Sequence, residues 1–265
     1  MHFRILAMLS LLLAVSCSKK ETTEGPDPLV VGMEMTYPPF EMRNAAGEPD
    51  GISVRLAEGL ADHLGRPLEL KDIAWDGIIP SLTSGKIDLI ISSMTRTDER
   101  AKTIDFTDGY VTNGLCLLVG KAAPIKSVED LKARGSEAKI AVKLTTTGHL
   151  WAKEHLPEAT LIVLADAASC ALEVGQGKAD AFIYDQVSIF RHAEVHPVTT
   201  RALLDPIREE TWAIGVNKGD DELRESVNEF LSKARDAGTF DALGERYMTE
   251  EKKAFEEAGV PFIFH

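Results

Sequence analysis

The chain has 265 residues, of which 44% are hydrophobic and 27% charged, the composition of a folded globular protein and not of a disordered or collagen-like one. It carries 29 Lys and Arg residues against 42 Asp and Glu residues, so its formal net charge is -13. So acidic a surface repels phosphate backbones and anionic lipid, which argues against nucleic acid as a partner and against membrane attachment through a basic patch. The length fits about two domains of ~150 residues each.

The N-terminus has the pattern of an export signal. Residues 5–15 are apolar except for one serine, follow a basic residue and are too short to span a bilayer. We predict a signal peptide over residues 1–16, with Cys17 and a flexible charged linker making up residues 17–28. The small residues before Cys17 resemble a lipobox, although Ala14 stands where leucine is usual. This resemblance implies a lipidated Cys17; an ordinary secretory signal is the alternative.

The rest of the chain alternates short apolar runs with amphipathic stretches, a pattern typical of α/β proteins with parallel sheets. The predicted strands are residues 29–31, 68–70, 87–91, 115–119, 139–142, 161–164, 179–184 and 212–216. We predict a helix over 54–64 with Ser53 as N-cap, a second beginning with a capping box at Ser127, and a third over 220–238.

One junction occurs twice. Residues 84–92 and 176–184 each contain Gly-Lys, then an Asp two residues later, then an apolar run. We interpret this as a common helix-to-strand connection and infer no duplication from it. It marks where the following strands end, and ligands of open parallel sheets bind beyond the carboxyl ends of strands.

Four predicted strand ends carry polar or aromatic side chains. They lead to Glu34, Tyr37 and Phe40; to Ser92, Ser93, Thr95 and Arg100; to Lys143, Thr145, Thr146 and Thr147; and to Asp185. Two of these ends lie in each half of the chain, as a cleft between two lobes requires.

These groups match the charges of a free α-amino acid. Arg100 offers a planar fork of donors for a carboxylate, and the helix expected to begin near Thr147 offers free N–H groups to the same anion. Asp185 can accept an ammonium. The remaining members of the predicted site are the hydroxyls of Ser93 and Thr95 and the rings of Tyr37 and Trp75. A buried zwitterion needs a partner for each charge. Taken singly, each residue fits a turn, a cap or a surface position equally well.

Four ordered motifs give these residues a context. They are VVGMEMTYPPFE at 30–41, WDGIIPSL at 75–82, SSMTRTDER at 92–100 and IDFTDGY at 104–110. Over roughly residues 29–247 the chain resembles family 3 of the bacterial extracellular solute-binding proteins, which serve ABC importers of polar amino acids.

The resemblance implies an α/β protein with the type II periplasmic-binding-protein fold, in which two α/β lobes are joined by two hinge strands and the ligand lies in the cleft. Lobe 1 would be discontinuous, containing residues 29–110 and 212–265, and lobe 2 would contain 111–211. The hinges would lie near 110–114 and 208–212.

The resemblance also implies roles for the site residues. Arg100 pairs with the ligand carboxylate, assisted by Thr147. The α-amino group is held by Ser93, Thr95 and Asp185, and the aromatic wall is Tyr37 and Trp75. One loop departs from the usual GTTG, because residues 145–148 read TTTG, so we expect its backbone to turn differently.

Glu34 and Lys143 suggest the ligand's side chain. Glu34 needs a donor and Lys143 an acceptor, and an amide supplies both, which favours glutamine or asparagine. A basic ligand suits Glu34 but is repelled by Lys143 unless that lysine points away. Alternatively, Glu34 and Lys143 pair with each other across the closed cleft and specify nothing.

We therefore expect the solute-binding component of an ABC transporter. It would capture a polar amino acid outside the inner membrane as a monomer anchored through Cys17, and deliver it to the permease subunits. We expect no metal, no cofactor and no enzymatic activity; a basic amino acid ligand, a ligand-sensing module and a cyclohexadienyl-dehydratase-like enzyme remain alternatives. Cys116 and Cys170 are predicted to be separate buried thiols, and the tail 248–265 to pack on lobe 1.

Overall fold

The computed structural model describes residues 25–264, so the predicted signal peptide and Cys17 lie outside it. Its strands are β1 (Leu29–Met33), β2 (Met42–Arg43), β3 (Pro49–Asp50), β4 (Leu68–Asp72), β5 (Leu89–Ile90), β6 (Asp105–Gly120), β7 (Lys139–Lys143), β8 (Thr160–Leu164), β9 (Ala181–Asp185) and β10 (Thr200–Val216). Its α-helices are α1 (Ile52–Leu64), α2 (Trp75–Thr83), α3 (Asp98–Ala101), α4 (Val128–Arg134), α5 (Thr147–His155), α6 (Ala167–Gly175), α7 (Gln186–Val195), α8 (Asp221–Asp236), α9 (Thr239–Tyr247) and α10 (Thr249–Glu257).

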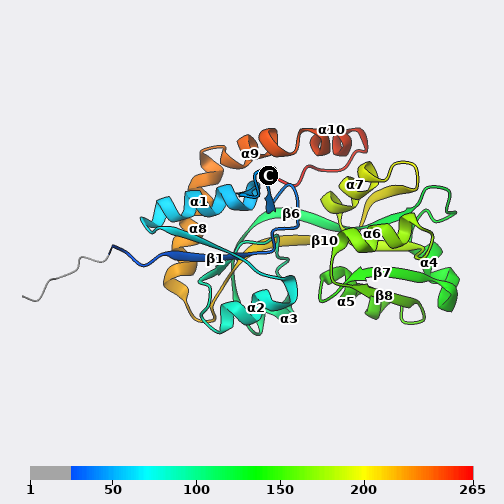
Figure 1. Ribbon diagram of the computed structural model, residues 1–265, viewed down its shortest axis with the longest axis horizontal. Helices are drawn as coiled ribbons and strands as arrows, with labels where there is room; N and C mark the ends of the chain where they lie inside the picture. Colours follow the sequence, from blue (N-terminus) through cyan, green and yellow to red (C-terminus); the bar gives the residue numbers. More distant parts are fainter. Residues whose placement is uncertain (1–24, 265) are drawn as a thin grey trace, which may run out of the picture.

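Two long strands join two lobes (Figure 1). Eight strands form one mixed sheet in the order β4-β1-β5-β10-β6-β9-β7-β8. In one lobe β1 pairs in parallel with β4 and β5, and in the other β7 pairs in parallel with β8 and β9. The antiparallel pair β6 and β10 belongs to both lobes, and Thr112 lies opposite Thr211 where the two predicted hinges meet. The lobe boundaries by residue number stay a prediction.

A strand occurs at every predicted run, but only Leu89–Ile90 of the run 87–91 is strand, and two runs are parts of longer strands. The predicted run 115–119 is part of β6, and 212–216 is the last part of β10. The apolar pattern marks the stretches that are buried inside a lobe. Between the lobes the same strands carry polar, partly exposed residues, so their continuation leaves no apolar run in the sequence.

Two of the three predicted helices begin as expected. Ser127 forms the predicted capping box, accepting from the N–H of Glu129 (3.2 Å) while the Asp130 carboxylate accepts from the N–H of Ser127 (3.2 Å). The helix predicted over 220–238 is α8, capped by the side chain of Asp220.

The prediction of Ser53 as an N-cap is wrong. Helix α1 begins one residue before it at Ile52, with Gly51 at the cap position and a φ of 116°. A Cβ at Gly51 would lie 2.3 Å from the carbonyl oxygen of Phe40, so only glycine fits there. Ser53 lies inside the first turn, and its hydroxyl instead donates to the carboxylate of Glu41 (2.6 Å).

The repeated junction has the same structure in both lobes. Gly85 and Gly177 adopt left-handed backbone conformations with φ of 70° and 71°. The Asp88 carboxylate then accepts from a backbone N–H near the start of β1 (3.0 Å), and Asp180 accepts from one at the start of β7 (2.8 Å). Each carboxylate therefore ties its junction to the neighbouring parallel strand.

Helices cover both faces of the sheet, and the large side chains of Phe40, Phe182 and Trp212 are fully buried.

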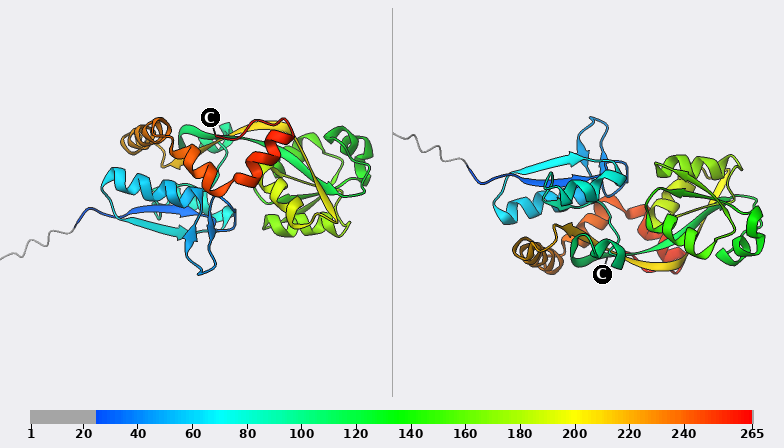
Figure 2. Two further views of the ribbon diagram at one scale, coloured as in Figure 1. Left: turned by 90° about the horizontal axis from the view of Figure 1, so that it is seen from above. Right: turned by 90° about the horizontal axis from the view of Figure 1, so that it is seen from below.

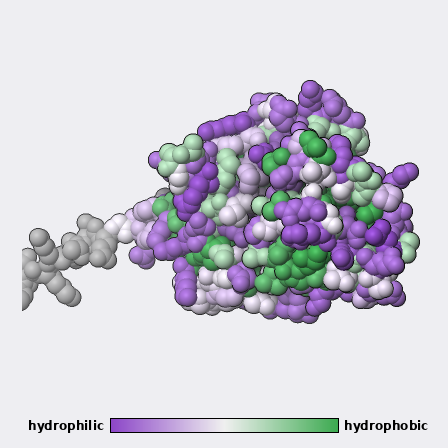
Figure 3. Space-filling view, turned by 45° about the vertical axis from the view of Figure 1, so that its right-hand side comes forward, coloured by the Kyte–Doolittle hydropathy of each residue, from purple (hydrophilic) through white to green (hydrophobic). Residues whose placement is uncertain are grey.

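Cys116 and Cys170 are both buried and unbonded, which confirms the prediction of separate thiols. The surface in Figure 3 is mainly hydrophilic, and the largest of its apolar patches lies in the lower middle of the view. Within residues 25–264, none of the helices combines the length and apolar character needed to cross a membrane.

Candidate ligand-binding site

A narrow pocket lies between the lobes beside the hinge strands. Eight of the nine predicted site residues line it: Glu34, Tyr37, Trp75, Ser93, Thr95, Arg100, Thr147 and Asp185. The ninth, Lys143, contacts the cavity residue Glu34. Four further lining residues are Glu41, Ser92, Thr146 and Tyr184. Their roles toward a ligand stay a prediction, but the fold brings all nine predicted residues together.

Arg100 is held at the boundary between the lobes. Its Nη1 donates to the carbonyl oxygen of Thr95 (2.7 Å), and its Nη2 donates to the carbonyl oxygen of Thr145 in the other lobe (3.5 Å). The guanidinium lies 5.2 Å from the centre of the Trp75 ring. Burial lowers the pKa of Arg100, yet a guanidinium stays charged at neutral pH. The group can therefore offer further N–H donors to a carboxylate in the cavity.

The start of α5 faces the same cavity. Thr146 is its N-cap and accepts from the N–H of His149 (3.4 Å), and Thr147 is its first residue. Free N–H groups at a helix start favour an anion. Thr145 has a φ of 59°, the left-handed region that glycine favours, although a β-branched residue occupies the position.

Asp185 is a buried carboxylate at the end of β9. It stands at the N-cap position of α7, but its side chain makes no cap hydrogen bond. It instead accepts from the side-chain amide of Asn113 in β6 (3.0 Å). Burial raises the pKa of Asp185, and the nearby carboxylate of Glu210 raises it further. A cation placed in the cavity would offset both effects, which makes Asp185 a suitable partner for an ammonium. Among residues 25–264, His, Cys, Asp and Glu side chains form no group of three or more that could hold a metal ion.

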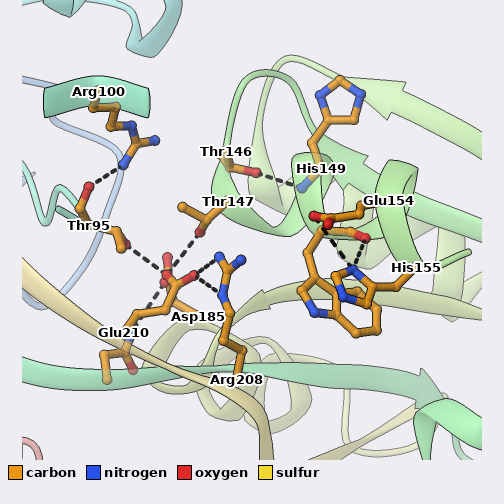
Figure 4. A network of polar contacts seen from close by, with 12 residues as sticks. Thr95, Arg100, Thr146, Thr147, His149, Glu154, His155, Asp185, Arg208 and Glu210 are labelled. Atoms are coloured by element: carbon orange, nitrogen blue, oxygen red, sulfur yellow. Dashed lines mark hydrogen bonds and ion pairs between the residues drawn. The ribbon is translucent and has the colours of Figure 1, made fainter. Parts of the chain in front are cut away.

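Glu210 connects the two lobes from the hinge strand β10 (Figure 4). Its carboxylate accepts from the hydroxyl of Thr95 in one lobe (2.7 Å) and from that of Thr147 in the other (2.9 Å), and it pairs with Arg208. The side chain is almost completely buried. Both threonines are therefore fixed by one carboxylate beneath the cavity.

Ser93 is held in an unusual backbone conformation by a second buried acid. Its φ is 49°, and its hydroxyl donates to Glu41 (3.1 Å), which also accepts from Ser53 (2.6 Å) and Ser92 (3.4 Å). Burial raises the pKa of Glu41 to about 8. Ser92 in turn accepts from the N–H of Glu34 (2.9 Å), so this network supports two predicted site residues.

Glu34 and Lys143 form an ion pair across the cleft. The Lys143 side chain is only 3% exposed, and its ammonium lies 5.7 Å from the centre of the Trp75 ring. The other carboxylate oxygen of Glu34 accepts from the N–H of Trp75 (3.3 Å). The geometry thus matches the alternative in which these two residues satisfy each other.

Tyr37 forms a wall of the cavity with rings that the sequence did not single out. It packs edge to face against Trp212 (5.8 Å between ring centres) and Tyr184 (5.9 Å). Within the described part of the chain its buried hydroxyl has no hydrogen-bond partner. Burial raises the pKa of this hydroxyl, and the nearby Asp185 carboxylate raises it further.

The supporting residues Glu41, Asn113 and Glu210 were missed. Glu41 stands inside a recognised motif and Glu210 inside a predicted hinge, so their positions were known but their burial was not. Most Asp and Glu side chains in proteins are exposed, so from sequence alone a glutamate is expected on the surface. Only the partners brought to it by the fold reveal that it is buried and hydrogen-bonded.

Known proteins resemble this chain over nearly all of its described length. It is 30% identical over 221 residues to the L-cystine-binding protein TcyJ of Escherichia coli K12, covering 83% of this chain and 82% of that protein. It is 31% identical over 241 residues to the ABC transporter glutamine-binding protein GlnH of Bacillus subtilis 168, covering 88% and 87%.

A solved structure supports the fold independently. The ancestral amino acid-binding protein AncCDT-1, described as a precursor of cyclohexadienyl dehydratase, superimposes with a TM-score of 0.77 at 37% identity. The match covers 84% of this chain and 95% of that one. This confirms the predicted type II fold, with two lobes joined by two hinge strands. The model of the bacterial extracellular solute-binding proteins, family 3, matches residues 29–250. The chain therefore belongs to that family.

Proposed function

We propose that the protein captures a free polar L-amino acid with an uncharged side chain, glutamine above all, and delivers it to the permease of an ABC importer. The observation that carries this proposal is the presence, in one pocket, of Arg100 and a buried acid, Asp185. The first complements a carboxylate and the second an ammonium, and an α-amino acid carries both.

The ion pair between Glu34 and Lys143 supports an uncharged ligand side chain. A cationic side chain would compete with Lys143 for Glu34, and an anionic one would compete with Glu34 for Lys143. Either would leave a buried charge unpaired, at a cost of several kcal/mol. An amide can donate to one member and accept from the other without separating them. One similar protein is named for glutamine, whereas solved relatives are described as bound to arginine or lysine.

A basic amino acid is the second candidate ligand. It would require the Lys143 ammonium to leave Glu34 and turn away from the cavity. The lysine already lies close to the Trp75 ring, which could hold it in such a position. Selectivity between the two classes therefore depends on the strength of one ion pair.

Binding is proposed to proceed by closure of the lobes, with lobe 1 comprising residues 29–110 and 212–265 and lobe 2 comprising 111–211. The ligand would first meet the arginine and serines of lobe 1. Contacts of Lys143, Thr147 and Asp185 would follow when lobe 2 closes. A ligand shifts this equilibrium only through the contacts it gains in the closed form.

The cellular setting follows from the same proposal. We infer that residues 1–16 are removed and that Cys17 is lipidated, so that a monomer is tethered in the cell envelope, outside the inner membrane. The closed form would present both lobes to the permease. A sensing module would use the same cleft, and neighbouring permease and ATPase genes would favour transport.

An enzymatic function has less support than amino acid binding, although one similar structure is described as the precursor of a dehydratase. A dehydratase needs a proton donor beside its substrate, and the raised pKa of Asp185 would allow that role. Asp185 is already bonded to Asn113, however, and its position suits an ammonium. Incubating the protein with prephenate and monitoring the absorbance of the mixture tests this directly. Turnover of prephenate would overturn a purely binding role.

Calorimetric titration with all twenty amino acids tests the proposal. The protein would carry Cys17→Ser to prevent acylation, and Arg100→Ala would serve as the control that lacks the carboxylate partner. We expect glutamine to bind the parent and not the control. Strong arginine binding without any response to glutamine would exclude the uncharged ligand while keeping the amino acid site.

A further inference from the structure

The C-terminal segment from Thr249 to Phe264 crosses from one lobe to the other. The family model ends at residue 250, so almost all of this segment lies beyond it. In Figure 1 the segment runs along one side of β6 and β10, whereas α2, α3 and α5, which carry site residues, lie on the other side. Figure 2 shows α10 reaching from α9 toward the second lobe. We call residues 249–264 the C-terminal strap.

The first part of the strap is attached to lobe 2. Glu251 is 2% exposed and forms an ion pair with Arg191 of α7. One turn later, Phe255 is fully buried and packs edge to face on Phe190 of the same helix, with 5.9 Å between ring centres. A buried carboxylate and a buried aromatic ring therefore both depend on this contact.

The end of the strap is attached to the hinge and to lobe 1. The carbonyl oxygen of Ile263 accepts from the N–H of Thr112 in β6 (3.1 Å). Phe264 packs against Phe40 and Phe240, at ring-centre distances of 6.4 Å and 5.7 Å. The tail thus packs on lobe 1 as expected, but it also contacts lobe 2.

We propose that the C-terminal strap restrains the angle between the lobes and favours the closed orientation seen here. Because α10 continues from lobe 1 and packs on α7 of lobe 2, any change in the angle between the lobes must shift α10 against α7 or Phe264 against lobe 1. The first shift would disturb the buried contacts of Phe255 and Glu251, and breaking a buried pair is strongly unfavourable. The cross-cleft ion pair of Lys143 with Glu34 is present in the same structure as the strap contacts.

This inference rests on the proposed closure of the lobes but needs no knowledge of the ligand. It predicts that weakening the strap increases the open fraction of the empty protein. Because apparent affinity scales with the fraction that is competent to bind, a closed fraction lowered about three- to tenfold raises the apparent Kd by the same factor.

Spin-label distances in the ligand-free protein test the strap. Labels at Thr83→Cys in α2 and Lys153→Cys in α5 report the separation of the lobes, in a Cys17→Ser background where Cys116 and Cys170 are buried. The strap is released by Glu251→Lys, with its exposed neighbour Glu250→Lys as the control of equal charge change. Arg191→Glu breaks the same pair from the other lobe, and the double variant restores it with reversed charges.

We expect longer distances in both single variants, and distances like those of the parent in the Glu250→Lys control and the double variant. If Glu251→Lys does not fold, the half-exposed position of Arg191 makes Arg191→Glu the deciding variant. Unchanged distances in a folded single variant would overturn the proposal. Calorimetry with glutamine adds the affinity change, and an absence of glutamine binding would count against the proposed ligand alone, because the distances do not depend on it.

Discussion

Replacing Glu41 by glutamine should stabilise the protein at neutral pH and leave its stability at pH 5 almost unchanged. Glu41 is 1% exposed, and its burial raises the pKa from 4.5 to about 8. Between these two values the folded protein holds a proton that the unfolded chain has released. Folding stability therefore falls as pH rises through this window, by about 1.4 kcal/mol per pH unit for one group.

The size of the effect follows from the same two pKa values. From pH 5 to pH 7.5 the wild-type protein should lose about 3 kcal/mol through this carboxyl alone. Glutamine cannot ionise, and its amide has nearly the same shape. The hydroxyls of Ser53, Ser92 and Ser93, which contact Glu41, can rotate to donate or accept, so the amide can be satisfied in place.

Urea denaturation at pH 5, 6, 7 and 7.5 measures this difference. Glu245→Gln on α9 is the matched control, because it is the same substitution at an exposed position. The stability gap between Glu41→Gln and wild type should widen by about 3 kcal/mol from pH 5 to 7.5, whereas the control should run parallel to wild type. A constant gap for Glu41→Gln would refute the reasoning, since Glu41 would then ionise at an ordinary pKa.

Three further predictions concern the ligand. Arg100→Ala removes two charge-assisted hydrogen bonds worth about 1.5–3 kcal/mol each, so the Kd for glutamine should rise at least about a hundredfold in calorimetry; a loss below about tenfold would place the carboxylate elsewhere. Lys143→Met leaves Glu34 unpaired, so competition experiments should show that the affinity for arginine rises relative to that for glutamine. An unchanged ratio of the two affinities would contradict a role for the ion pair in selectivity. Because burial and a neighbouring carboxylate raise the pKa of Asp185, an ammonium must displace a proton on binding. The affinity for glutamine should therefore increase from pH 6 to 8, and calorimetry in two buffers of different ionisation enthalpy should measure a proton released on binding. Asp185→Asn should bind glutamine weakly and release no proton. If the variant released as many protons as the wild type, the proton would come from another group.

Much of the fold was predictable because burial leaves a pattern in the sequence. The strands at 139–142 and 161–164 are apolar runs between turn signals, and they occur where predicted. The start of α1 was misplaced because serine is a common N-cap, whereas here the backbone approaches Gly51 too closely for any side chain. The hinge portions of β6 and β10 were expected as strands only from the family resemblance, because they contain no continuous apolar run that would predict a strand.

The candidate site was predictable for a different reason. Its residues follow the carboxyl ends of strands, and the topology of an open sheet brings those ends together. Sequence alone therefore identified Arg100 and Asp185 as a complementary pair. It left the partners of Glu34 and Lys143 open, and in the structure the two side chains form an ion pair with each other.

The composition, the ordered motifs and the alternation of strands and helices determined the family, the two-lobed architecture and the general chemistry of the site. These features are local, so each can be read from neighbouring residues. The buried acids Glu41 and Glu210, and the strap that joins the lobes through Glu251, were decided only by tertiary structure. An acidic residue is costly to bury, and nothing in its own neighbourhood reveals the distant hydroxyls, amides and cations that make its burial possible.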